Sequence, residues 1–151
     1  MCARMFTEAA FLGRRTLYGL AAVAALGFAL SLLVHVAAWR GIAPPSGAWG
    51  LHVGIFVVGV PSVFVSRQLV GDSKRRDVWT VILRGAPAWT PVAMQCLFVY
   101  AVANFGLFMF QSPPRGTTPD EALVARGFSG HWLLFYGGAM ATLYSAARLR
   151  E

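Results

Sequence analysis

Residues Arg67 to Arg84, RQLVGDSKRRDVWTVILR, decide the arrangement of the whole chain. This segment is the most charged part of the sequence, and long apolar runs lie on both sides of it. Loops rich in Lys and Arg stay on the cytoplasmic side of a membrane. The segment therefore gives a fixed point from which the neighbouring apolar runs can be oriented.

The composition indicates an integral membrane protein. Of the 151 residues, 57% are apolar and only 13% are charged, which is about half the charged share of a soluble domain. A water-soluble fold of this size could not bury so much apolar surface, whereas lipid can cover it. The formal charge of +7 lies between the apolar runs. This pattern favours the bilayer and its anionic headgroups as partners, and argues against nucleic acid.

Four apolar runs are long enough to cross a bilayer. A helix rises 1.5 Å per residue, so about 20 residues cover a hydrocarbon core of about 30 Å. The sequence therefore predicts an all-α polytopic membrane protein, a four-transmembrane-helix antiparallel bundle forming one domain over residues 1–151. The expected spans are residues 17–38, 51–70, 89–110 and 131–147, with a basic loop over 71–88 and an outer loop over 111–130.

The basic loop is expected to contain a short amphipathic helix from Ser73 to Arg84, between spans two and three. Apolar residues recur on one side of this segment and basic residues crowd its first turn, as in helices that lie along a membrane surface. A solvated basic loop is the alternative. The expected membrane-surface anchors are Lys74, Arg75, Arg76, Trp79 and Arg84.

The outer loop is expected to contain a second short helix. Thr118 would cap it and Pro119 would occupy the first helical position, where proline is well tolerated. This helix should end after about two turns at Gly127, since glycine commonly closes helices. Ser129 would then cap the fourth span, which is expected to start at His131.

The basic residues indicate the orientation. Four spans would place ten basic residues on the side of the basic loop and three on the opposite side. Because Lys and Arg favour the cytoplasmic side, both termini should be cytoplasmic. A high content of Arg, Ala and Gly suggests a GC-rich bacterial genome, so the expected location is a bacterial inner membrane. The ten are Arg4, Arg14, Arg15, Arg67, Lys74, Arg75, Arg76, Arg84, Arg148 and Arg150, and the three are Arg40, Arg115 and Arg126.

The three histidines should all lie at the outer rim of the bundle, at similar depth. His35 ends the first span, His52 begins the second and His131 begins the fourth. Three imidazoles could hold a transition metal, and two could ligate haem b. A structural role is the more economical interpretation, because none of them has a spaced partner histidine. His35 follows Ala24, Gly27 and Ser31 on a small-residue face that should point into the bundle.

Four polar residues within the spans are further candidates. Asn104 and Gln95 lie in the third span, where a polar side chain is either functional or satisfied by a hydrogen bond between helices. Ser31, Asn104 and Thr142 would have to line a continuous path if the protein were a channel or carrier for a small neutral solute. A single interhelical hydrogen bond explains Asn104 or Gln95 more simply.

No catalytic motif is recognisable, and neither of the two cysteines belongs to a CxxC pair. The favoured interpretation is a non-enzymatic membrane protein without a cofactor, either an accessory subunit of a larger complex or a homo-oligomeric bundle. The alternative is a haem- or metal-binding redox protein that uses the outer histidines. A small-solute channel or carrier is the weaker alternative.

Overall fold

The structure is a computed structural model, and it describes residues 12–71, 78–114, 116–118 and 120–150. The described residues form helices joined by short loops, with no β-strand among them. The elements in order are α1 (Arg14–Trp39), the short 3-10 helix η2 (Ser46–Trp49), α2 (Gly50–Val70), α3 (Val78–Leu83), α4 (Thr90–Gln111) and α5 (Glu121–Arg148).

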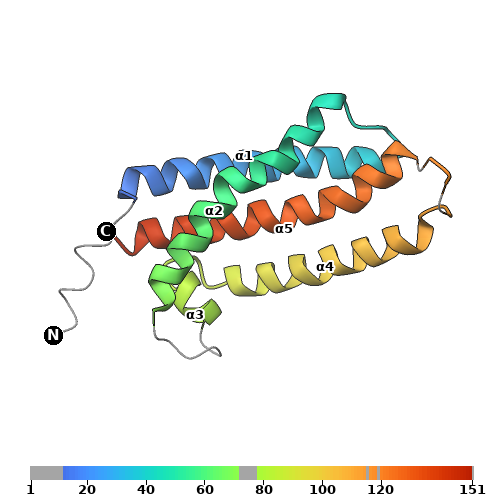
Figure 1. The fold of residues 1–151 in the computed structure, drawn as a ribbon. Coiled ribbons are helices and arrows are strands. Elements are labelled where there is room, and N and C mark those ends of the chain that lie inside the picture. The colour runs from blue at the N-terminus through green and yellow to red at the C-terminus, as the bar shows by residue number, and fades with distance from the viewer. Residues whose placement is uncertain (1–11, 72–77, 115, 119, 151) are drawn as a thin grey trace.

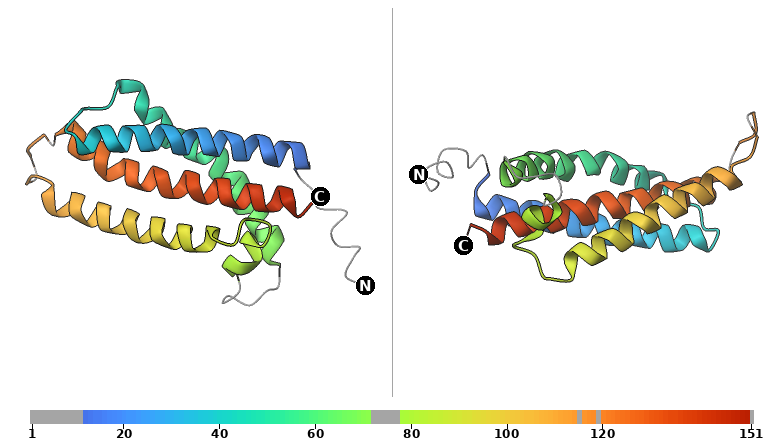
Figure 2. Two further views of the ribbon diagram at one scale, coloured as in Figure 1. Left: turned by 180° about the vertical axis from the view of Figure 1, so that it is seen from behind. Right: turned by 90° about the horizontal axis from the view of Figure 1, so that it is seen from below.

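Helix α5 is the centre of the arrangement. It lies between α1 and α4, and α2 crosses the face of α1 and α5 (Figures 1 and 2). The start of α1, the end of α5 and the short helix α3 lie at one end of the molecule, here called the α3 end. The α1–α2 and α4–α5 connections lie at the opposite end, here called the outer end.

Among the described residues, three helical segments are long and apolar enough to cross a membrane: Arg14–Trp39, Ser46–Val70 and Thr90–Gln111. This finding agrees with the predicted membrane class. Helix α5 is not among the three segments, although it has 28 residues. Its position explains its composition, because α5 contacts other helices on most of its circumference and carries small and weakly polar residues there.

The predicted inward face of the first span is confirmed. Ala24, Gly27, Ser31 and His35 are all buried on α1. Gly27 permits the closest approach, because a Cβ atom there would lie 2.2 Å from Cε1 of Tyr136 on α5. Only glycine allows the aromatic ring to lie this close to the α1 backbone.

The predicted helix end at Gly127 is wrong. Helix α5 runs without a break from Glu121 to Arg148, and its N-cap is Asp120, whose carboxylate accepts the Ala122 amide hydrogen at 2.8 Å. Gly127 serves packing, since a Cβ there would lie 2.5 Å from Cγ of Phe108 on α4. Ser129 is therefore an interior residue of α5 and not a helix cap.

The amphipathic helix is shorter among the described residues than predicted. Helix α3 covers Val78–Leu83, and Lys74, Arg75 and Arg76 lie outside the described residues. Its apolar side packs on protein, since Ile82 and Leu83 are buried. The Ser145 hydroxyl on α5 donates to the Ile82 carbonyl at 2.6 Å, and its oxygen accepts the amide hydrogen of Gly85 at 3.0 Å. Trp79 and Arg84 remain exposed.

Candidate functional site: a polar cluster at the outer end

His35 is the centre of a polar cluster that joins α1, α4 and α5. Its Nε2 accepts the indole N–H of Trp39 at 3.0 Å and is also hydrogen-bonded to the hydroxyl of Tyr100. An indole nitrogen can only donate, so Nε2 must be an acceptor and the proton must lie on Nδ1. Nδ1 then donates to Oγ of Ser129 at 2.7 Å, and this hydroxyl is 3.3 Å from the Arg126 carbonyl. The bonds thus form one directional chain from α1 to α5.

Arg126 extends this cluster towards the outer surface. Its guanidinium lies over the Trp39 ring, 4.4 Å from the centroid, and donates to the side-chain oxygen of Gln111. A cation above an indole face is attracted by the ring quadrupole. One side chain of α5 therefore contacts both α1 and the end of α4.

Asn104 connects α4 to α5 in the same region and is only 2% exposed. Its amide donates to the carbonyls of Arg126 and Gly127, at 2.9 and 3.3 Å. The amide also lies against Gly130, where a Cβ atom would be 2.5 Å from Nδ2. The predicted hydrogen bond between helices is thus present at this residue.

The other two histidines occupy different helix interfaces. His52 on α2 accepts the indole N–H of Trp132 on α5 at 3.0 Å. The ring of His131 packs edge-on against Phe105 of α4, with centroids 4.6 Å apart, and its Nδ1 lies 3.2 Å from the Gly127 carbonyl. No group of three His, Cys, Asp or Glu side chains within the described ranges is placed to hold a metal ion. Ligation by His35 would require breaking one of its existing bonds.

The remaining predicted polar residues are dispersed. Ser31 is fully buried on α1, and its hydroxyl has no partner among the described residues. Gln95 is exposed on α4. Thr142 lines an apolar groove between α2 and α4 that neither Ser31 nor Asn104 lines. The structure does not bring Ser31, Asn104 and Thr142 together around this groove.

Sequence reasoning missed the partners of His35. Trp39 follows His35 by four residues, a spacing that places two side chains on the same helix face. Tyr100 lies one helical turn before Asn104 in the third span. These spacings were visible in the sequence, but the contacts with Ser129 and Arg126 depend on how α5 packs between the other helices.

Comparison with known proteins gives no relative for this chain: no protein-family model, no curated protein and no solved structure matches it.

Proposed function

We propose that the chain is a four-span bundle of a bacterial inner membrane with both termini in the cytoplasm. The length of α5 supports a fourth span, because 28 helical residues extend about 42 Å. Its Arg148 lies at the same end of the molecule as Arg14, Arg67 and Arg84. This concentration of positive charge at the α3 end favours a cytoplasmic position for that end.

The proposed role is that of a non-enzymatic membrane component that assembles with protein, either as an accessory subunit or as a homo-oligomer. The observation that carries this proposal is the exposed amide of Gln95 on α4. An amide facing lipid lacks the hydrogen-bond partners that water would supply, so association with another helix would stabilise it.

The position of α4 supports the same interpretation. It packs mainly on α5, and only Thr90, Ala101 and Asn104 of its 22 residues are buried. Most of its circumference is left for lipid or a partner helix. The exposed large apolar side chains on α4 are Val92, Phe98, Val99, Val102, Leu107, Met109 and Phe110.

The polar groups of the outer end favour a structural role over a ligand site. The two ring nitrogens of His35, and the Nδ1 atom of His52, are already bonded to side chains of other residues. Side-chain hydrogen bonds between membrane helices stabilise their packing, by about 0.6–2 kcal/mol each. These histidines therefore act, in this proposal, as contacts that hold the helices together.

Cys96, which is exposed next to Gln95, gives a direct test. In membranes carrying the Cys2→Ser variant, an added oxidant should join the Cys96 thiol as a disulfide to Cys96 of a second copy, or to a thiol of a partner subunit. The matched control is Cys2→Ser/Cys96→Ser/Val23→Cys, which places the only thiol on the exposed surface of α1. This control should give no specific product, and Gln95→Leu should weaken the cross-link at Cys96.

Equal cross-linking from α1 and α4, or a purely monomeric mass in native mass spectrometry from mild detergent, would contradict the proposed assembly.

A further inference from the structure

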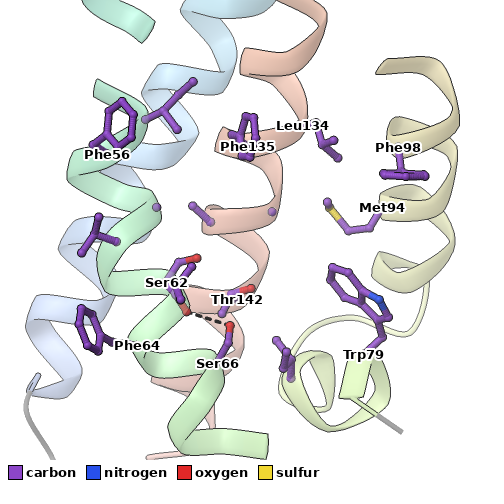
Figure 3. A pocket seen from close by; sticks show the side chains of 17 residues that line it. Phe56, Ser62, Phe64, Ser66, Trp79, Met94, Phe98, Leu134, Phe135 and Thr142 are labelled. Carbon is purple, nitrogen blue, oxygen red and sulfur yellow. Dashed lines mark hydrogen bonds between the residues drawn. The ribbon is translucent and has the colours of Figure 1, made fainter. Parts of the chain in front are cut away.

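A groove of about 560 Å³ lies between α2 and α4, at the half of the molecule nearer to α3. Figure 3 shows Phe56 and Phe64 on its α2 side, and Met94 and Phe98 on its α4 side. Helix α5 supplies the floor and Trp79 lies at one end. Several of its wall residues are exposed, so the groove opens sideways towards the surrounding medium.

The walls are almost entirely apolar. Three hydroxyl side chains line the groove, those of Ser62, Ser66 and Thr142. The Ser66 hydroxyl donates to the carbonyl of Ser62 in its own helix at 2.8 Å (Figure 3). The one hydrogen that this hydroxyl can donate is thereby used within α2. Transfer of an apolar group from lipid into this groove would therefore cost little free energy, and transfer from water would be favourable.

The volume of the groove suits a small apolar occupant. Its volume of about 560 Å³ is within the range of about 300–1,000 Å³ that is usual for small-molecule sites. Because the groove opens to the side, a single flexible hydrocarbon chain can enter it from the surrounding lipid.

The length and depth of the groove match one membrane leaflet. On α2 it extends from Ile55 to Ser66, eleven residue steps that span about 16 Å of helix. This is about half of a hydrocarbon core of about 30 Å. The groove ends near Trp79, which is 61% exposed. Tryptophan is enriched at the level of the lipid headgroups.

Positive charge lies at the same end of the groove. Arg67 directly follows the wall residue Ser66, and Arg84 comes two residues after the wall residue Ile82. Both arginines are exposed. A basic residue near a membrane surface attracts anionic lipid, so an anionic headgroup suits this position better than a zwitterionic one.

We propose that this groove binds one acyl chain of an anionic phospholipid from the leaflet at the α3 end, with its headgroup near Arg67 and Arg84. The inference depends on the chain spanning a membrane. It does not depend on the assembly proposed through Gln95 and Cys96.

The test counts lipids that stay bound to the full-length protein in native mass spectrometry. The probes are dioleoyl phosphatidylglycerol, which is anionic, and dioleoyl phosphatidylcholine, which has the same chains and a zwitterionic headgroup. Wild-type protein should retain one phosphatidylglycerol under conditions that remove other lipids, and should bind phosphatidylcholine more weakly. Arg67→Gln and Arg84→Gln should each weaken phosphatidylglycerol binding about fivefold.

Gly59→Phe should abolish retention of the lipid. A Cβ at Gly59 would meet only Cγ2 of Ile55, at 3.8 Å, so a phenyl ring can enter the groove without disturbing the helix packing. The matched control is Gly106→Phe on α4. A Cβ at Gly106 has no neighbour within 4 Å, and this residue does not line the groove.

Several results would overturn the inference. Undiminished lipid retention by Gly59→Phe would contradict the site, and equal binding of the two lipids would contradict the role of the arginines. If Gly59→Phe abolishes a dimer, and the wild-type protein retains no lipid, the occupant of the groove is protein.

The Arg67→Gln and Arg84→Gln variants keep the groove testable if Gly59→Phe fails to fold, because both side chains are exposed. Cross-linking at Cys96 should be unchanged in Gly59→Phe, and lipid retention should be unchanged in Gln95→Leu.

Discussion

The outer end and the α3 end of this protein are built in opposite ways. At the outer end, polar side chains of α1, α4 and α5 are joined by hydrogen bonds, and His35 and Asn104 are nearly inaccessible. Nearer to α3, the space between α2 and α4 is left unfilled by protein. The contrast suggests that directional hydrogen bonds fix the helices at one end, whereas the other end can accept an apolar molecule. Substitutions at the two ends should therefore have different effects.

The largest loss of stability is expected for His35→Ala. The change removes the acceptor of the Trp39 indole and the donor to Ser129, and it leaves a cavity among buried groups. Loss of about 2 kcal/mol in the free energy of unfolding is expected. Unfolding by SDS in mixed micelles, followed by circular dichroism, measures it. An unchanged free energy of unfolding would show that the polar cluster does not fix the outer end.

A smaller loss, of about 1 kcal/mol, is expected for Asn104→Leu. The substitution removes the hydrogen bonds to two carbonyls of α5 but keeps an apolar side chain of similar size. Gln95→Leu on the same helix is the matched control, because its side chain is exposed. The same SDS unfolding measurement should show no loss for this control in the monomer. Equal losses for the two variants would argue against a specific role for Asn104.

Tyr100→Phe should lower the free energy of unfolding by about 0.5 kcal/mol. Its hydroxyl shares Nε2 of His35 with the indole of Trp39, which can still donate after the substitution. Trp39→Phe should lower the free energy of unfolding more than Tyr100→Phe does, because it removes the indole donor and also weakens the cation–π contact with Arg126. The reverse order in SDS unfolding would contradict the assignment of the Nε2 acceptor.

The smallest effect on stability is expected at the other end of the molecule. Gly59→Phe enters open space, so the free energy of unfolding without added lipid should change by no more than about 0.5 kcal/mol. A loss comparable to that of His35→Ala would show that the groove is packed as tightly as the outer end.

Sequence patterns predicted the membrane class and the buried face of α1, because apolar run length and the spacing of small residues are local properties. They failed at Gly127, because a glycine in the sequence can either end a helix or make room for an aromatic ring of a neighbouring helix. Only the position of Phe108 distinguishes the two cases. The expected depth of the three histidines did not determine their contacts, since His35, His52 and His131 face different neighbours. The groove has no local signal, because it depends on how α2 and α4 lie around α5.

The most direct test of the difference between the two ends is the shift of the unfolding midpoint on addition of phosphatidylglycerol. A ligand that binds only the folded state raises its stability in proportion to the logarithm of one plus the ratio of free ligand concentration to Kd. Wild-type protein and His35→Ala should be stabilised equally, although the variant starts from a lower midpoint, whereas Gly59→Phe should gain nothing. Equal stabilisation of all three proteins would contradict the account.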